Sequence, residues 1–505
     1  MKRILCVLPS IILFCALSLT PAGALEHWDA AAEVARLSAE APALAAFPGT
    51  SGVVWMSSDR YSLSASGGKQ HDSIFVLLLG ANAISSKKFP YPAYGGAALE
   101  ITEAAWYDPS DGKRLGDLPK REYDENGIKG MEVLFPDAAE GQAVAVTTTE
   151  TVPGEYRLDD VIFLSGELPA WEQSVEVELP EGMNLYWTGV GVLDPERKKN
   201  GRTQLMTWTV LNEPAWVSSG LVDSGRPSLA FSLDHGQLAG LKKLRSLENP
   251  PYAPPIPPSV SSVRANLAKT IENISEYMSS LSIPRGNGAE TVRAENVPAA
   301  GPWTGWEQAL IAGRWLSSLG FDVNVYWTQS VPVGSDGPSS PKIWHEPVLK
   351  VSDKAGHEMY FKAGQSGDPE KPHPSLYGAA LYRAGNNGVE KITLPKGSAS
   401  DNALSQSWKV RVDENGRAAG TLNITLTGGW MDVFAIDSGS DSDAIAAGVL
   451  NGMNLNVPGT SLALKSAKSL PSGCRLSFEV ESAPGIASSG NMLLKLMGAL
   501  PSSLA

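Results

Sequence analysis

A proline-rich run at residues 249–258 constrains the folding of this chain more than any other feature. Six of its ten residues are proline. Proline fixes the backbone angle φ and has no N–H group, so this run cannot form a helix interior or a central strand. The run predicts an extended, semi-rigid connector. We therefore expect separate folding units on its two sides, with a protease-sensitive connector between them.

The chain before the connector has the pattern of a β-rich module. Between about residues 52 and 216, short β-prone segments alternate with turn signals such as the one at 108–112. The strongest segments are Val53–Met56, Ser73–Leu79, Ala143–Thr147 and Ser174–Leu179. Many short strands separated by frequent turns favour a β-sandwich. An Ala- and Leu-rich stretch at 29–46 predicts one short helix ahead of the strands.

The chain after the connector changes to a helical pattern. Apolar residues recur at steps of three and four, which predicts an amphipathic helix. These residues are Val263, Leu267, Ile271, Ile274, Met278 and Leu281. A second helix is expected from about Thr304 to Leu319, ended by Gly320. Strands are expected at Phe321–Trp327, Val348–Val351 and Glu358–Phe361, which gives an α+β domain.

The last hundred residues return to a β pattern. Strands are expected at Leu404–Val412, Gly420–Thr427 and Trp430–Ile436, with one helix near 441–452. The expected fold class is therefore multidomain, β-rich plus α+β. The expected parts are a signal peptide at 1–24, a β-sandwich module at 25–245, a Pro-rich linker at 246–262, an α+β domain at 263–395 and a β-rich domain at 396–505.

The first 24 residues have the layout of a secretory signal peptide. Lys2 and Arg3 precede an apolar run, and Ala22-Gly23-Ala24 offers small residues before a cut after Ala24. A membrane anchor is the alternative, but the run from Ile4 to Leu19 is short for a bilayer span of about 20 residues. The segment predicts a periplasmic or secreted protein with no membrane span after cleavage.

Charge and cysteine content exclude several function classes. The net charge is −13, and no basic stripe is present, which argues against nucleic acid as a partner. Two of the three cysteines lie in the signal segment, so only Cys474 would remain in the mature chain. One cysteine allows no internal disulfide. Its sequence surroundings predict a strand residue rather than a nucleophile.

Metal and cofactor signals are weak. The acidic loop at 437–443 has three carboxylates that could hold Ca²⁺, but it lacks the distal bidentate Glu of a calcium loop. Its Asp441 or Ser442 suits a helix N-cap instead. His345 and His357 have no supporting zinc-ligand pattern. We therefore expect neither a metal nor a cofactor.

Several local motifs accompany this order of modules. They are Phe47-Pro48-Gly49 leading into Val53-Val54-Trp55, the turn Asp111-Gly112-Lys113, the segments 153–156 and 208–214, and the tail motifs at 413–416 and 420–422. Together they resemble a family of bacterial exported proteins in which an uncharacterised β-sandwich module precedes a transglutaminase-like domain. The resemblance covers nearly all of the mature chain and implies a papain-like α+β core between two β modules.

The resemblance also implies where catalytic residues would lie. Active members of the family place a Cys at a helix start, a His before a strand and an Asp at the end of the next strand. A thiol at a helix N-terminus is acidified by the helix dipole, His takes its proton, and Asp orients the His. The matching positions here are Trp303, His345 and Lys362. Only the His is kept, which predicts that thiol catalysis is lost.

Other readings of this region remain open. His345 could act as a general base with Thr304 as a substitute nucleophile, and Glu346 or Asp353 could replace the orienting acid. Trp303, Trp306, Trp344 and the neighbouring Glu346 could instead line a groove for a glycan or peptide, since indoles offer a rigid contact surface. Trp327 belongs to the same cluster of indoles. The opposing interpretation is that Trp303 fills the vacated site as a core residue.

Three hypotheses for function follow. The first is an exported, non-catalytic transglutaminase-like protein, a pseudoenzyme that binds or organises a protein, peptide or glycan of the cell envelope. The second is an enzyme of the transglutaminase or protease class with an active site rebuilt around His345. The third is a glycan- or peptide-binding protein with a Trp-lined cleft. Exposure of Trp303 and Trp306 separates the first hypothesis from the third.

The signal peptide gives the first testable prediction. Because Ala22 and Ala24 satisfy the small-residue rule of the export peptidase, the mature chain should begin at Leu25. Mass spectrometry of the exported protein measures this terminus directly. An intact Met1 on a membrane-bound protein would contradict the prediction.

Overall fold

A computed structural model describes most of the chain between residues 28 and 481. The residues outside this description are 1–27, 48–49, 65–66, 81–87, 94–95, 126, 136–138, 155–157, 167, 217–225, 249–253, 282, 284–290, 294–296, 365–369, 398–402, 413–417, 429, 435–441, 453–460, 471–472 and 482–505. The signal segment and most of the acidic loop at 437–443 therefore lie outside the described residues. Among the helices of the described part, none is long and apolar enough to cross a bilayer.

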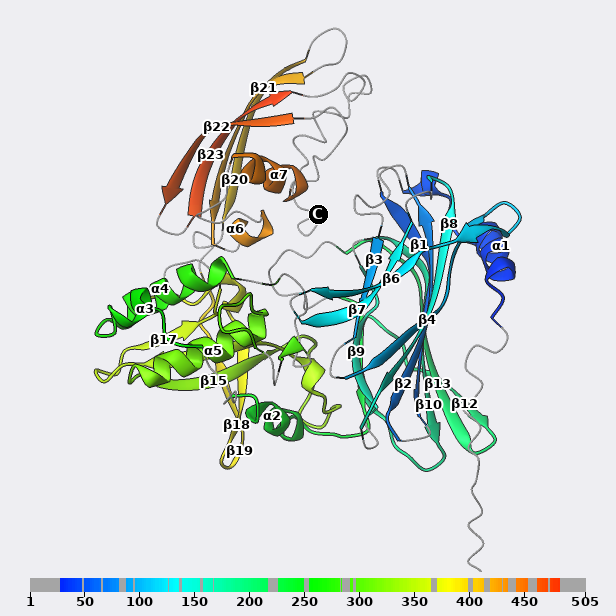
Figure 1. Ribbon diagram of the computed structural model, residues 1–505, viewed down its shortest axis with the longest axis horizontal. Helices are drawn as coiled ribbons and strands as arrows, with labels where there is room; N and C mark the ends of the chain where they lie inside the picture. The colour runs from blue at the N-terminus through cyan, green and yellow to red at the C-terminus, as the bar shows by residue number, and fades with distance from the viewer. Residues whose placement is uncertain are drawn as a thin grey trace, which may run out of the picture.

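The chain is β-rich and multidomain, with few helices and five sheets (Figure 1). The N-terminal module begins with helix α1, capped by the Asp29 carboxylate, and a short 3₁₀ turn η1 (Leu44–Ala46). Its elements are α1 (Ala30–Glu40), β1 (Gly52–Leu63), β2 (Lys69–Leu79), β3 (Lys88–Pro92), β4 (Ala98–Asp108), β5 (Lys113–Asp117), β6 (Lys120–Glu125), β7 (Ile128–Leu134), β8 (Ala143–Val152), β9 (Asp159–Phe163), β10 (Ala170–Pro180), β11 (Tyr186–Val190), β12 (Glu196–Asn200), β13 (Thr203–Glu213) and β14 (Ser228–Ser232).

One large sheet organises this module. Its eight strands follow the order β12-β13-β10-β1-β2-β8-β4-β5, and two three-stranded sheets, β11-β14-β9 and β3-β7-β6, complete the module. Alternation along β2 shows how the sequence directs the packing. Val76 and Leu78 face a core shared with α1, while Leu77 and Leu79 face a core shared with β7. Both faces of the central strands are therefore buried.

The central domain is an antiparallel sheet covered by helices. The sheet follows the order β17-β16-β15-β18-β19. The elements are α2 (Gln237–Arg245), α3 (Pro258–Ser261), α4 (Leu267–Ser279), α5 (Gly305–Ser318), β15 (Asp322–Gln329), η3 (Pro341–Ile343), β16 (Trp344–Ser352), β17 (Glu358–Phe361), η4 (Pro374–Leu376), β18 (Ala380–Gly385) and β19 (Gly388–Thr393). Gly320, with φ +92°, makes the tight turn from α5 into β15. Helix α5 and the strands β15, β16 and β17 lie where the sequence predicted them, whereas β18 and β19 were not predicted.

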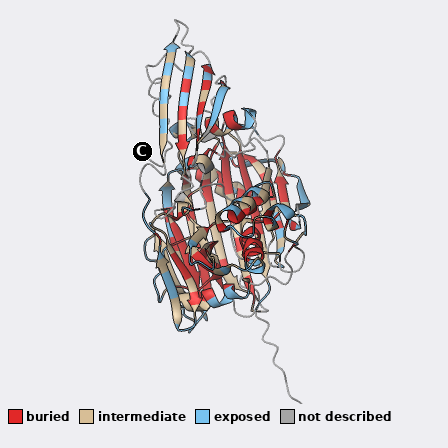
Figure 2. Cartoon of the chain, turned by 90° about the vertical axis from the view of Figure 1, so that its left-hand side faces the viewer, coloured by how far each residue is buried: buried red, intermediate tan, exposed pale blue. Residues whose placement is uncertain are grey.

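The C-terminal module is a four-stranded sheet with two helices on one face. The sheet follows the order β20-β21-β23-β22. Its elements are β20 (Leu404–Val412), β21 (Ala418–Thr427), α6 (Trp430–Val433), α7 (Ser442–Gly452), β22 (Ser461–Leu470) and β23 (Gly473–Glu481). Buried and more exposed residues alternate along β23, so one face packs on the helices and the other faces solvent (Figure 2).

One predicted strand of this module is wrong. The sequence analysis placed a strand at Trp430–Ile436, but Trp430–Val433 form the short helix α6. Trp430 and Phe434 are four residues apart and both are buried, with ring centroids 6.4 Å apart. That spacing puts both rings on one side of a helical turn, facing the sheet.

The hydrophobic cores do not divide at the proline-rich connector as the sequence suggested. Leu241 and Leu244 of α2, which the sequence analysis assigned to the N-terminal module, pack in the core of the central domain together with Ala230 of β14. The end of the connector is also packed, because the indole N–H of Trp315 donates to the carbonyl of Pro254 at 2.7 Å. The apolar face of α2 is buried on the central sheet side, so the two parts share one core.

Truncation of α2 tests this shared core. Leu241→Ala should destabilise the central domain by roughly 2–5 kcal/mol, because it leaves a cavity among fully buried side chains. Lys242→Ala, which removes an exposed neighbour on the same helix, should change stability by less than about 0.5 kcal/mol. Urea unfolding followed by tryptophan fluorescence measures both variants. Equal effects of the two substitutions would contradict the placement of α2 in this core.

Candidate functional site

The start of helix α5 lies at the end of the central sheet where β15 ends and β16 begins. The Trp306 ring, in the first turn of α5, packs on the Trp327 ring near the end of β15 with centroids 4.8 Å apart. Gln329, the last residue of β15, pairs with Trp344, the first residue of β16. His345, the second residue of β16, is half-buried at this end of the sheet.

The end of β17 reaches the same end of the sheet. Phe361 pairs with Leu349 in the antiparallel register between β16 and β17, and Lys362 follows directly. A β-carbon on Gly364 would collide with the side chain of Gln308, which lies in the first turns of α5. The start of α5, the start of β16 and the end of β17, with Trp303, His345 and Lys362, therefore lie toward one end of the central sheet.

Trp303 is a core residue at the start of α5. Its side chain is 0% exposed, and its indole N–H donates to the carbonyl of Pro298 at 2.8 Å. Its backbone N–H donates to Leu281 at 2.7 Å, and its carbonyl accepts from Ile283 at 2.8 Å. The ring meets Trp315 edge to face, with centroids 6.1 Å apart. The indole thus fills the position where the resemblance expects a thiol.

The other indoles of the predicted groove are buried as well. Trp306 is 0% exposed and Trp344 is 2% exposed. These indoles are core residues rather than the exposed lining that an aromatic groove requires, because α5 and the sheet close over them. Of Glu346, the fourth binding candidate, the structure describes the backbone in β16 but not the side chain.

The first turn of α5 is closed by a capping box and an ion pair. The hydroxyl of Thr304 accepts from the N–H of Glu307 at 3.3 Å, and the Glu307 carboxylate accepts from the N–H of Thr304 at 3.0 Å. Arg293 pairs with Glu307 at 2.6 Å and also donates to the carbonyl of Pro302. Thr304 is 0% exposed, so it serves as a helix cap rather than as the substitute nucleophile that the sequence left open.

A serine contacts a lysine and a histidine beside this site, and sequence analysis did not identify it. Lys362 Nζ donates to Ser375 Oγ at 3.3 Å, and Ser375 Oγ lies 2.8 Å from His373 Nδ1. The backbone N–H of Ser375 also points to His373 Nδ1 at 3.3 Å. That N–H requires a lone pair on Nδ1, so the serine hydroxyl is the group that donates to the histidine. The sequence carried no signal for this contact, because nothing in it joins 362 to 375.

The one cysteine of the described part lies far along the chain, in β23 of the C-terminal module. Cys474 is a free, buried thiol in the core of that module, as its strand pattern predicted. Burial raises the pKa of this thiol above its ordinary value. A neutral, buried thiol is a poor nucleophile.

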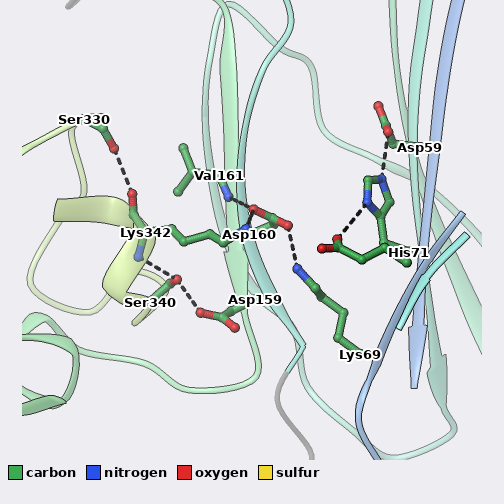
Figure 3. A network of polar contacts seen from close by, with 10 residues as sticks. Asp59, Lys69, His71, Asp159, Asp160, Val161, Ser330, Ser340 and Lys342 are labelled. Atoms are coloured by element: carbon green, nitrogen blue, oxygen red, sulfur yellow. Dashed lines mark hydrogen bonds and ion pairs between the residues drawn. The ribbon is translucent and has the colours of Figure 1, made fainter. Parts of the chain in front are cut away.

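A second polar cluster lies in the N-terminal module, where the large sheet approaches the central domain. His71 of β2 contacts Asp59, as Figure 3 shows, and its other ring nitrogen lies near the carboxylate of Glu150. The Asp59 contact is 2.8 Å and the Glu150 contact is 3.7 Å. The Tyr61 ring stacks on the imidazole, with centroids 4.3 Å apart and an interplanar angle of 3°. A protonated imidazole suits this arrangement of two carboxylates and one aromatic face.

A buried carboxylate between two lysines continues this cluster. Asp160 of β9 accepts from Lys69 of β2 at 2.9 Å and from Lys342, which precedes β16, at 2.7 Å (Figure 3). Burial alone would raise the pKa of Asp160, but the two ammonium groups lower it far below its ordinary value. The preceding residue, Asp159, accepts from the hydroxyl of Ser340. Charged groups more than a hundred residues apart thus meet in one buried network.

Comparisons with known proteins add one finding about the fold. No family model and no curated protein matches this sequence. The crystal structure of a "putative protease" from Parabacteroides distasonis ATCC 8503 is 14% identical, has a TM-score of 0.52 and covers 89% of this chain and 98% of that chain. At this identity the likeness shows a shared fold alone. An M1 zinc metallopeptidase from Deinococcus radiodurans is 12% identical over 52% of this chain and 63% of that chain, with a TM-score of 0.24 that carries no argument.

The pKa of His71 gives a testable pH dependence. Burial alone would lower this pKa, but hydrogen bonds to Asp59 and Glu150 raise it to about 9, above the 6.5 of an unperturbed histidine. A folded-state pKa that lies above the unfolded value stabilises the fold fully below about pH 6.5 and no longer does so above about pH 9. His71→Gln should therefore lower the free energy of unfolding by at most about 3 kcal/mol near pH 6, and by progressively less toward pH 10.

Urea unfolding of wild type and His71→Gln at pH 6, 7.5 and 9.5 measures this difference. A constant difference across the series would contradict the assignment of a protonated His71 between two carboxylates.

Proposed function

We propose that this chain is an exported protein whose transglutaminase-like central domain has lost thiol catalysis and acts by binding or organising a protein, peptide or glycan of the cell envelope. The observation that carries the proposal is the burial of Trp303 in the core. The residue stands at the start of α5, where the resemblance expects the nucleophile, and it is buried and hydrogen-bonded in the core.

The chemistry of the indole supports the loss of acyl transfer. The family reaction requires a thiolate that attacks a carbonyl carbon and carries the acyl group. The indole of Trp303 has no basic lone pair for such an attack, and its one polar group, the N–H, already donates to Pro298. The only thiol of the described residues, Cys474, lies in another module.

The third position of the site supports the same conclusion. An Asp beside the catalytic His orients its ring and favours the imidazolium that forms during proton transfer. Lys362, which follows β17 at this position, carries the opposite charge and would disfavour the imidazolium of His345. The Trp in place of the family's Cys and the Lys in place of its Asp both remove the same reaction step, the formation of an activated nucleophile. The solved neighbour named as a protease supports the proposal only through the shared fold.

An assay of acyl transfer and peptide hydrolysis tests this proposal. Wild type should show no turnover above buffer, and iodoacetamide should not change its binding or stability, because no activated thiol exists. Cys474→Ser should be equally silent in these assays, with a Tm within a few degrees of wild type. The matched comparison is wild type beside His345→Ala. Turnover that is lost in the alanine variant would show that another nucleophile acts with His345.

One observation favours a second candidate function, hydrolysis through Ser375. The Ser375 hydroxyl donates to His373 Nδ1, and Lys362 lies within 3.3 Å of the same oxygen. In such a reaction the serine oxygen bonds to an ester carbonyl carbon while His373 takes the hydroxyl proton and passes it to the departing alcohol. Water then releases the acid from the acyl-serine.

A fluorophosphonate probe separates the two candidates. Covalent labelling that Ser375→Ala abolishes and Ser407→Ala leaves intact would establish the second function. Absence of labelling in wild type would leave Ser375 as a structural residue of η4, whose start is capped by His373 Nδ1.

A further inference from the structure

The segment that joins β15 to β16, residues Ser330–Ile343, is a loop closed at its own base. The backbone N–H of Ser330 donates to the carbonyl of Ile343 at 2.7 Å, and the Ser330 hydroxyl donates to the same carbonyl at 2.9 Å. We name this segment the docking loop. Val331 and Val333, near its start, are buried in the core of the central domain.

The docking loop is bound along its length by the chain that leaves β14. The N–H of Ser339 donates to the carbonyl of Asp234 at 2.9 Å, and the N–H of Gly236 donates to that of Gly337 at 2.9 Å. The hydroxyl of Ser232, a buried residue of β14, donates to the carbonyl of Ser339 at 2.8 Å. These contacts satisfy the backbone of a loop that would otherwise need water.

A polar and a charged side chain near the end of the docking loop contact the N-terminal module. The fully buried Ser340 donates to Asp159, and Lys342 pairs with Asp160 at 2.7 Å (Figure 3). Lys69 pairs with Asp160 from the opposite side, and both of those side chains are less than 10% exposed. A buried carboxylate that loses one of its cations leaves an uncompensated charge, so this network resists separation of its parts.

The charged groups of this network come from several elements. Three cations, His71, Lys69 and Lys342, lie among four carboxylates, Asp59, Glu150, Asp160 and Asp159, the last of which accepts from Ser340. These groups come from β1, β2, β8, β9 and the docking loop. The last residue of the loop, Ile343, and the next residue, Trp344, are buried in the core of the central domain. His345 follows, so displacement of Lys342 would be transmitted to the start of β16 over three residues.

From these contacts we infer that the docking loop locks the N-terminal module to the central domain and fixes the start of β16, where His345 lies. The device is an intramolecular strap whose release would change the end of the sheet where β16 begins, which carries the candidate site. This inference goes beyond the proposed function and does not depend on it. It concerns how two modules are coupled, whatever the central domain binds.

A double-mutant cycle on the full chain tests the strap. Lys342→Met and Asp160→Asn should each lower the Tm, and the double variant should lower it by clearly less than the sum of the two, because the residues contact each other. Hydrogen exchange of residues 330–346 should rise by at least about tenfold in Lys342→Met. Lys354→Met, which removes an exposed lysine after β16, is the control and should change neither quantity.

Lys342→Arg keeps the inference testable if Asp160→Asn does not fold. The arginine retains the positive charge, so its hydrogen exchange should stay within about threefold of wild type while that of Lys342→Met rises. Additive Tm shifts in the cycle would contradict the inference that the docking loop locks the two parts together. Unchanged hydrogen exchange at 330–346 in a folded Lys342→Met variant would contradict it as well.

Discussion

Burial of helix α5 is the constraint on which the rest of the central domain depends. The helix is buried over Trp306–Gly313 and again at Trp315 and Leu316, which is more than one face of an ordinary surface helix. The central sheet covers one side, α4 contacts α5 through Met278 and Tyr277, and α2 extends the same core over β18 and β19. A helix enclosed in this way has no room for an open cleft at its start. The fully buried indole of Trp303 extends this core to the start of α5.

The core around α5 also joins the N-terminal module to the central domain. Apolar residues of α2 complete the core around α5, although they precede the proline-rich connector. The docking loop adds a polar contact that the core alone cannot supply, because Asp160 and Lys342 make hydrogen bonds of fixed direction. Apolar burial gives these modules their common stability, and the charged network gives them one relative position. The candidate site is therefore held by residues from both sides of the connector.

Local patterns in the sequence predicted much of this fold. The apolar spacing of Leu310, Ile311 and Trp315 located α5, and the apolar, β-prone run at 73–79 located β2. Trp430 was assigned to a strand, and only the packed structure shows the helical turn. The Asp160–Lys342 pair joins positions 182 residues apart, and no single-sequence pattern encodes such a contact. The residues of the candidate site were chosen from their order along the chain relative to the expected helix and strands. The burial of its indoles depends on tertiary packing, which that order does not give.

The central claim is that Trp303 is a sealed core residue where the resemblance expects a nucleophile. Hydrogen exchange of its indole N–H tests this claim most directly, because that proton is bonded to Pro298. The resonance can be assigned in ¹⁵N-tryptophan-labelled protein by its absence from Trp303→Phe. The account predicts strong protection of this proton, comparable with that of the indole N–H of Trp315, which donates to Pro254 in the same core. Exchange as fast as that of a free indole would show an open site at the start of α5 and would contradict the account.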